Sequence, residues 1–149
     1  GEGQQAGTLF YLLNPIAQSD GPEKADVYRV EPYVICGDIY STSPYVRRGG
    51  WTWYTGSAAW MYRLGLEGIL GFHKAGNTLR IDPVIPPDWA EYEIRYQFGK
   101  SVYLIRVQNP EHVATGVRQM ALDGKPLKGG AIPLVDDQQK HQVIVTLGR

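Results

Sequence analysis

The side chains best suited to chemistry in this sequence gather between residues 31 and 62. Nine of the seventeen aromatic residues lie in or beside this segment: Tyr28, Tyr33, Tyr40, Tyr45, Trp51, Trp53, Tyr54, Trp60 and Tyr62. An aromatic ring can stack on the apolar face of a sugar while its polar tip forms a hydrogen bond. We expect Trp60 and Tyr62 to pack inside a buried helix, whereas ligand contact and core packing both stay open for Trp51, Trp53 and Tyr54.

A loop rich in glycine and hydroxyl side chains overlaps the aromatic segment. It runs through Gly49, Gly50, Trp51, Thr52, Trp53, Tyr54, Thr55, Gly56 and Ser57. Such a loop at the start of a helix can bind an anion, because free backbone N–H groups and the positive end of the helix dipole point at it. Arg47 and Arg48 come just before it and could add charge-assisted hydrogen bonds. The alternative is an ordinary capped helix that binds nothing.

The other ionisable groups are less informative. Glu31 and Asp38 could form the carboxylate pair of a glycosidase, but we favour the simpler interpretation that Glu31 caps a helix and Asp38 is solvated. The three histidines are scattered, and none has metal-ligand spacing with another histidine, cysteine or carboxylate, so we expect no metal site. Cys36 lies in an apolar run, which predicts a buried and inert thiol.

Composition narrows the function classes. Fifteen basic residues balance fifteen acidic ones, so no net charge attracts nucleic acid or an anionic membrane. No apolar stretch approaches the ~20 residues of a membrane span, and we expect no direct membrane contact. A single cysteine suits a reducing compartment, here the cytoplasm. The start of the chain lacks signal-peptide features and an initiator methionine, which suggests a piece of a longer protein.

The pattern of elements changes near residue 77, from helices joined by long loops to short strands. We predict a helix over residues 32–40, with Pro32 in its first turn, and a largely buried helix over residues 57–70, capped by Thr55 or Ser57. Period-two alternation over residues 92–98 predicts a strand, and Asp123 followed by Gly124 predicts a hairpin. We therefore expect an α+β fold whose four or five short strands form an antiparallel sandwich.

Two strings of residues resemble glycoside hydrolase family 94. The first is Val30, Glu31, Pro32, Tyr33 and Val34, and the second continues the glycine-rich loop from Gly49 through Ser57 to Ala58, Ala59, Trp60, Met61, Tyr62 and Arg63. That family includes cellobiose, chitobiose and β-1,2-oligoglucan phosphorylases and the C-terminal module of cyclic β-1,2-glucan synthases. The amino-acid sequence of the loop is most similar to that of the β-1,2-glucan branch, and the resemblance covers residues 7–110.

The resemblance implies a fold and a reaction. Residues 1–75 would be the last helices and active-site loop of an (α/α)6 barrel, and residues 76–149 a C-terminal β domain. The family carries out inverting phosphorolysis, in which an aspartic acid protonates the glycosidic oxygen while phosphate attacks from the opposite face. By resemblance Glu31 lines a sugar subsite, and Thr55 and Gly56 bind phosphate. From the residue types in and before the loop, and not from the resemblance, we expect further substrate contacts at Tyr45, Trp51, Trp53 and Tyr54 and a phosphate contact at Arg48.

Two departures from the family pattern shape the expected function. The general acid of the family lies in an Asp-Trp-Asn-Asp-like motif that this sequence lacks, so we expect the isolated chain to be inactive and to hold no catalytic residue. Relatives usually have a histidine where this sequence has Tyr45, which implies weaker phosphate binding.

These observations leave two hypotheses. The chain is either the C-terminal fragment of a phosphorylase or glucan-synthase module, or a stand-alone, non-catalytic carbohydrate-binding or structural domain. As a fragment it needs no cofactor, and phosphate is the co-substrate of the parent. Its expected partners are a β-glucan oligosaccharide, phosphate and the remainder of the parent polypeptide. We expect the parent to be anchored in the bacterial inner membrane.

Overall fold

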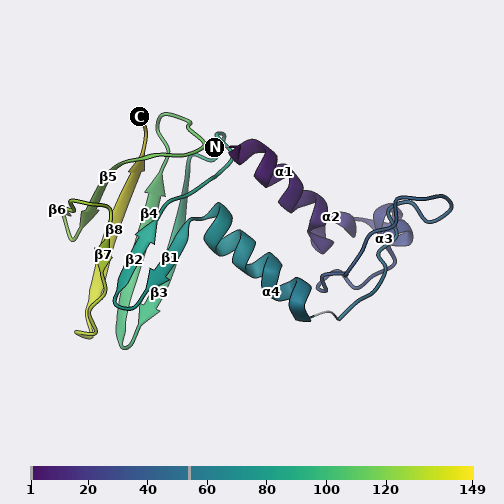
Figure 1. The fold of residues 1–149 in the computed structure, drawn as a ribbon, viewed down its shortest axis with the longest axis horizontal. Helices are drawn as coiled ribbons and strands as arrows, with labels where there is room; N and C mark the ends of the chain where they lie inside the picture. Colours follow the sequence, from purple (N-terminus) through teal and green to yellow (C-terminus); the bar gives the residue numbers. More distant parts are fainter. Residues whose placement is uncertain (1, 54) are drawn as a thin grey trace. The chain divides into compact units, whose positions relative to one another are not determined.

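The structure, a computed structural model, describes residues 2–53 and 55–149, with the side chain of Thr55 left out (Figure 1). The chain forms two compact units. The helical unit comprises Gly7–Gly65. The β unit comprises Leu66–Arg149 together with the residues up to Ala6.

Among the described residues, four α-helices lie in the first half of the chain: α1 (Gly3–Leu13), α2 (Pro15–Gln18), α3 (Pro22–Tyr28) and α4 (Thr55–Arg63). The start of α2 is fixed locally, because Pro15 occupies the first turn and Asn14 Oδ1 accepts a hydrogen bond from the Ile16 N–H at 3.0 Å. Pro22 likewise opens α3. The helices described here are too few to close an (α/α)6 barrel, so the barrel stays a prediction, as does the domain boundary at residue 75.

The helix predicted over residues 32–40 is wrong. This segment is a loop whose backbone groups bond to a distant segment instead of to their own turn. The Gly37 N–H donates to Trp51 O at 2.5 Å and the Tyr40 N–H donates to Arg48 O at 2.9 Å, and Ile39 forms an isolated bridge with Gly49. Once these donors pair with residues 48–51 they cannot form the i to i−4 hydrogen bonds of a helix.

The helix predicted over residues 57–70 is partly correct. Helix α4 starts earlier, at Thr55, which excludes Ser57 as its N-cap, and after Arg63 it widens into the π-helix η1 (Leu64–Ile69). Gly71 follows with a φ of +69°, and a Cβ there would lie 2.2 Å from the backbone carbon of Asp82, so only glycine ends the helix in this way.

The expected burial of this helix is wrong as well. Trp60 is 71% exposed and Tyr62 is 69% exposed, so neither packs in a core. Burial begins only at the end of the helical segment. Ile69 is buried, its carbonyl accepts from the Val84 N–H at 3.0 Å, and the Leu70 carbonyl accepts from the Tyr92 hydroxyl at 2.8 Å. These contacts attach the last turn to the β unit.

The β unit holds two sheets (Figure 1). The smaller sheet has the order β1 (Phe72–Ala75), β2 (Thr78–Ile81) and β7 (Ile132–Pro133). The larger has the order β3 (Glu91–Phe98), β4 (Ser101–Gln108), β8 (Lys140–Leu147), β5 (Val117–Leu122) and β6 (Lys125–Pro126). The α+β class is confirmed. The wholly antiparallel sandwich is wrong, because β4 and β8 pair in parallel, and the strands outnumber the four or five expected.

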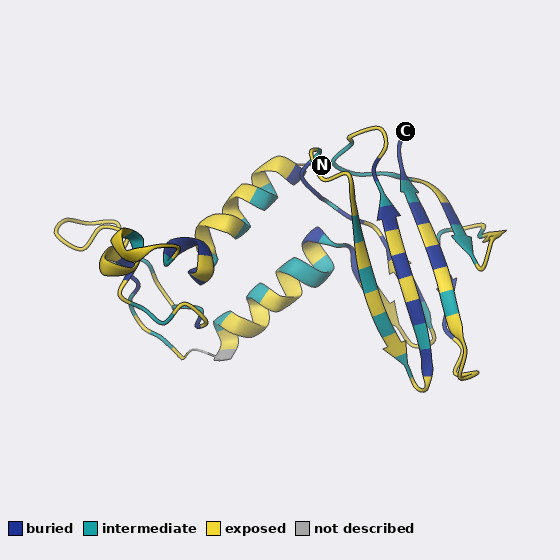
Figure 2. Ribbon diagram, turned by 180° about the vertical axis from the view of Figure 1, so that it is seen from behind, coloured by how far each residue is buried: buried dark blue, intermediate teal, exposed yellow. Residues whose placement is uncertain are grey.

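The core of the β unit follows from alternation along the strands. On β4 and β8, every second side chain is fully or nearly fully buried, and these include Tyr103, Ile105, Val107, Val143, Val145 and Leu147. Leu79, Ile85 and Ile132 add further buried aliphatic side chains. Period-two alternation of this kind gives a sheet one face in the core and one in solvent. Figure 2 shows this banding along the strands.

Candidate functional site

The loop of residues 29–53 carries most of the residues singled out from the sequence, and it lies entirely in the helical unit. Its two arms run side by side through the hydrogen bonds that join Gly37 to Trp51 and Tyr40 to Arg48. The N–H of Gly49 also donates to the carbonyl of Tyr28, at 2.9 Å, which ties the returning arm to the end of α3. Backbone hydrogen bonds therefore join the two arms of the loop to each other and to the end of α3.

Asp38 shapes the glycine-rich arm. Its Oδ1 accepts a hydrogen bond from the Trp51 N–H at 2.8 Å, and its carbonyl accepts from the Gly50 N–H at 2.9 Å. A Cβ on Gly50 would lie 1.9 Å from Asp38 Oδ1, so the carboxylate can approach only because residue 50 is glycine. Asp38 is exposed, as the solvated interpretation expects, but its carboxylate is also bonded to the loop backbone. The adjacent glycines of the sequence were the signal of this close approach.

Glu31 and Trp53 come together although they are 22 positions apart. The indole Nε1 of Trp53 donates to Glu31 Oε1 at 3.3 Å, and the ring of Tyr33 meets that of Trp53 edge to face at 6.5 Å. Tyr33 is 75% exposed and Trp53 is 68% exposed. Trp53 also has a φ of +63°, a left-handed backbone that bulky residues rarely adopt. Strain of this kind gathers at functional sites, so Trp53 marks this part of the loop as a candidate for ligand contact.

A second cluster surrounds Tyr45. Its ring lies 6.2 Å from that of Tyr40, and the guanidinium carbon of Arg48 lies 5.4 Å from its ring centroid, within the range of a cation–π interaction. These three residues, with Gly49 and Gly50, line an open hollow of about 470 Å³. The hollow offers aromatic rings, two phenolic hydroxyls and one guanidinium, a combination that suits a neutral sugar with many hydroxyl groups.

The expected phosphate site lies mostly outside what the structure describes. Helix α4 starts at Thr55, but Tyr54 and the side chain of Thr55 lie outside the described residues. Gly56 is exposed, with open space around it. Arg48 stacks on Tyr45, and Arg47 donates to Gln18 Oε1 at 3.1 Å. The assignments of Thr55, Gly56 and Arg48 to phosphate therefore stay predictions.

Arg47 has a structural role that the sequence did not reveal. Its acceptor Gln18 is buried and also donates from Nε2 to the carbonyl of Leu12 at 2.7 Å. The guanidinium therefore fastens the long loop to α2. A contact across 29 positions leaves no mark in the local pattern.

Tyr28, at the end of α3, contacts Cys36 of the loop. The Tyr28 hydroxyl lies 3.3 Å from Cys36 Sγ, and Tyr28 is almost fully buried. Burial, followed by the hydrogen bond with Cys36, raises the pKa of Tyr28. The hydroxyl therefore stays protonated and serves packing. Cys36 is half-buried, so it is less enclosed than expected. Within residues 2–53 and 55–149 there is no cluster of metal-ligating side chains.

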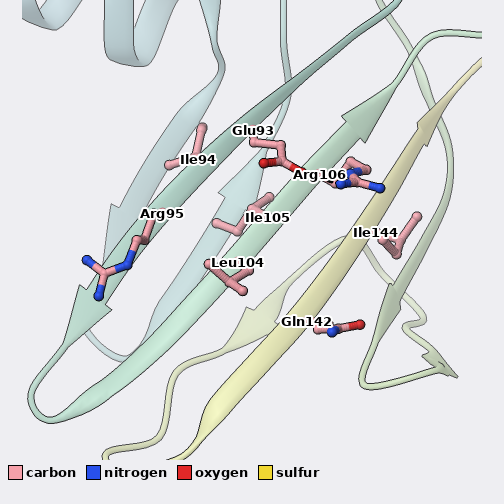
Figure 3. Close-up of a pocket in the computed structure, with 8 residues that line it drawn as sticks. All are labelled: Glu93, Ile94, Arg95, Leu104, Ile105, Arg106, Gln142 and Ile144. Atoms are coloured by element: carbon pink, nitrogen blue, oxygen red, sulfur yellow. Dashed lines mark hydrogen bonds and ion pairs between the residues drawn. The ribbon is translucent and has the colours of Figure 1, made fainter.

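A further hollow lies in the β unit, on the outer face of the larger sheet (Figure 3). It measures about 200 Å³ and is shaped by strands β3, β4 and β8. Leu104 and Ile144 are partly exposed there, beside Arg95 and the ion pair of Arg106 with Glu93. The residues of this face could not be singled out from the sequence, because outward positions on alternating strands look the same whether or not they line a hollow. Among the described residues, no helix has the length and apolar character of a bilayer span.

Residues 1–71 match the family model described as glycosyl hydrolase 94 superfamily, catalytic domain. The chain is 45% identical over 104 residues to the cyclic beta-(1,2)-glucan synthase NdvB of Rhizobium meliloti (strain 1021), an alignment that covers 70% of this chain and 4% of that protein. It is 34% identical over 150 residues to the N,N'-diacetylchitobiose phosphorylase of Vibrio proteolyticus, covering 99% of this chain and 18% of that protein.

Solabiose phosphorylase of Paenibacillus borealis is 28% identical over 148 residues, covering 99% of this chain and 19% of that protein. The chain thus spans less than a fifth of the length of each of these three relatives.

Proposed function

Because this chain belongs to the glycosyl hydrolase 94 superfamily, we propose that it is the C-terminal part of an inverting β-glucan phosphorylase-type module, carried by a cyclic β-1,2-glucan synthase. In this proposal it supplies residues that bind sugar and phosphate but not the general acid. The observation that carries the proposal is the match of residues 1–71 to the catalytic-domain model, which contains the whole aromatic loop.

The proposed reaction breaks the glycosidic C–O bond and forms a bond between the anomeric carbon and a phosphate oxygen on the opposite face. A carboxylic acid elsewhere in the parent protonates the leaving glycosidic oxygen. Phosphate is already a nucleophile, so the reaction needs no strong general base. The chain described here would then hold the sugar and the phosphate in line, which is catalysis by positioning.

The contact between Glu31 and Trp53 supports a sugar subsite. A carboxylate has two oxygens, and Trp53 Nε1 bonds to Oε1, which leaves Oε2 as an acceptor for a sugar hydroxyl in the proposed complex. The exposed faces of Tyr33 and Trp53 would stack on the apolar face of the sugar ring. Tyr45 and Trp51 are exposed as well, and we propose that they contact other sugar units of the glucan.

The exposed apolar side chains of the helical unit support its status as a fragment. Leu9, Leu12 and Leu13 on α1 are each about half exposed, and Trp60 on α4 is 71% exposed. Large exposed apolar surfaces are typical of protein interfaces. We propose that the remainder of the parent polypeptide covers these helices and completes the barrel. The compartment we propose is the cytoplasm, on the basis of the single cysteine.

A second candidate is a stand-alone carbohydrate-binding domain, which the exposed rings of Tyr33, Trp51 and Trp53 would suit. Detectable binding of β-1,2-glucan by the isolated chain, undiminished relative to the parent, would favour this second candidate over the first.

The deciding experiment uses the full-length parent with two substitutions in the loop. Glu31→Gln keeps the shape but removes the charge, and should raise the Michaelis constant for glucan more than that for phosphate. Thr55→Val removes the hydroxyl at nearly constant volume, and should do the reverse. Glu23→Gln, on the exposed first turn of α3, is the matched control. If neither substitution changes either constant, the loop does not form the substrate site and the proposal fails.

A further inference from the structure

His141 lies between two aspartates in the β unit. Its Nδ1 is 2.8 Å from Asp123 Oδ2, and its Nε2 is 3.1 Å from Asp137 Oδ1. The histidine side chain is only 15% exposed, while the two aspartate side chains are each nearly half exposed. Asp123 belongs to the turn between β5 and β6, and Asp137 belongs to the connection between β7 and β8, residues 134–139. His141 therefore connects the β5–β6 turn with the β7–β8 connection, two segments that are not paired with each other as strands.

The connection of residues 134–139 depends on side chains for its anchoring. Ser101 Oγ donates to Asp137 Oδ1 at 2.9 Å and accepts from the N–H groups of Asp137 and Gln138, both at 2.9 Å. The hydroxyl of Tyr103 accepts from the Val135 N–H at 2.8 Å. The ring of Tyr103 also stacks on that of His141, with centroids 4.6 Å apart. Histidine, serine and tyrosine thus hold one connection against the paired strands β4 and β8.

The count of protons decides the charge of His141. An ionised carboxylate only accepts hydrogen bonds, and a neutral imidazole has one N–H. A neutral His141 would satisfy one aspartate and point a nitrogen lone pair at the other. Only the imidazolium, with both nitrogens protonated, can donate to both. We propose that His141 is an imidazolium at neutral pH and acts as a pH-sensitive clamp that ties the β7–β8 connection to the β5–β6 turn of the larger sheet.

The charges around the ring agree with this geometry. The groups that face the imidazole are Asp123 from the β5–β6 turn, Asp137 from the β7–β8 connection, and Tyr103 from β4. Asp136, beside them, accepts from the backbone N–H of Lys100 at 2.7 Å. The hydrogen bond with Asp123 raises the pKa of His141, partial burial opposes this, and the hydrogen bond with Asp137 raises it further.

The pKa values of both aspartates move the opposite way. The hydrogen bond from His141 is the largest cause that lowers the pKa of Asp123. For Asp137 the hydrogen bond from the Gln139 N–H is the largest, followed by that from Ser101, with His141 contributing less. Asp137 thus stays ionised partly for local reasons, so His141 is the group whose proton decides whether the clamp is closed.

The direction of the pH dependence follows. A histidine whose pKa is raised by folding stabilises the protein fully below its unfolded pKa, ~6.5, and this contribution is lost as the pH rises through the higher folded value. Aspartates whose pKa is lowered by folding contribute fully above their unfolded pKa, ~3.9, and the contribution is lost as the pH falls through the lower folded value. The clamp is therefore closed at pH values between the lowered folded pKa of the aspartates and the raised folded pKa of His141. As the pH rises from neutral, the clamp opens when His141 loses its proton.

The test is an NMR titration of the imidazole carbons and nitrogens of the 149-residue chain. The same His141 in the denaturant-unfolded chain is the reference. We expect the folded His141 to titrate at higher pH than the unfolded one, and its nitrogen shifts at neutral pH to be those of an imidazolium. A folded midpoint at or below the unfolded one, or a neutral tautomer at pH 7, would overturn the proposal without any substitution.

Substitutions then separate the clamp from its surroundings. Asp137→Asn retains an oxygen acceptor but loses the charge, so the His141 midpoint should fall; Asp88→Asn, in an exposed turn of the same unit, should leave it unchanged. In the unsubstituted chain the thermal unfolding midpoint should fall as the pH rises into the alkaline range. In His141→Gln this fall should be absent, because the titrating imidazole is gone. If Asp137→Asn leaves the His141 titration where it was, the two aspartates do not hold the proton and the clamp is wrong.

Discussion

The two units of this chain differ in how far they bury their large apolar side chains. In the β unit, Leu79, Ile85 and Ile105 are at most 1% exposed. In the helical unit, Leu12 is 50% exposed and Trp60 is 71% exposed (Figure 2). Burial of apolar surface is the dominant favourable term in folding, so the β unit contains a core of its own, whereas the helices leave large apolar side chains exposed, as protein interfaces do. The proposed sugar loop belongs to the unit with the exposed apolar side chains.

The largest effect expected from this contrast concerns activity. The pure chain should release no α-glucose 1-phosphate from β-1,2-glucan in the presence of phosphate, because it lacks the family's general acid, a contribution typically worth ~10²–10⁴-fold in rate. The measurement is a coupled assay for glucose 1-phosphate, with the full-length parent at equal concentration as the positive control. Release by the pure chain above the buffer blank would contradict the proposed division of the active site.

The next prediction compares the truncation of one apolar side chain to alanine in each unit. Ile105→Ala removes a buried branched side chain and should lower the free energy of unfolding by about 2–5 kcal/mol, through lost transfer energy and the remaining cavity. Leu12→Ala in the isolated chain should change it by less than about 1 kcal/mol, since half of that side chain is already exposed. Urea denaturation followed by circular dichroism measures both.

The same pair in the parent protein sharpens the comparison. If the remainder of the parent covers α1, Leu12→Ala should become as destabilising there as a core substitution. An equally small effect in the parent would mean that α1 remains exposed and that the helical unit does not join a barrel through this face.

The sequence predicted the β unit better than the helical unit for a physical reason. Period-two alternation is a local property, and the strand over residues 92–98 appears as β3. The parallel pairing of β4 with β8 is non-local, since its partners are separated by 38 positions, as in Tyr103 with His141. Local hairpin signals favour antiparallel neighbours and give no sign of such a crossover.

In the helical unit the errors share one cause. The helix over residues 32–40 was predicted because Pro32 suits a first helical turn, but backbone donors of this segment pair with residues 48–51 across the loop. The burial of α4 was predicted from its apolar side chains, and an apolar helix face does not by itself say which part of a protein, if any within this chain, covers it. At the site, composition found Glu31 and Trp53 separately, while their hydrogen bond across 22 positions could be seen only in the structure.

A pair of glycines tests how rigidly the sugar loop is built. Gly50→Ala places a methyl group against Asp38 and should break the hydrogen bond from Trp51, destabilising the chain by about 1–3 kcal/mol as overpacking does. Gly56→Ala, in open space in the first turn of α4, should change the stability by less than about 1 kcal/mol, because glycine costs most in a helix interior. Thermal unfolding monitored at the helical signal compares them. Equal and small effects would mean that Asp38 moves freely and does not shape the loop.

The smallest effect is expected on the outer face of the larger sheet. Arg106 donates from Nε to Glu93 Oε1 at 2.7 Å, a hydrogen bond that is the first cause of the raised pKa of Arg106 (Figure 3). The two side chains are 50% and 62% exposed, and solvent and salt screen such pairs so well that many contribute nothing measurable. Glu93→Gln should therefore leave the unfolding midpoint of the isolated chain unchanged within error, at low and at high salt alike. A clear fall in the midpoint, stronger at higher protein concentration, would show that a second molecule covers this face. The β unit would then share with the helices the need for a partner, and the contrast between the two units would fail.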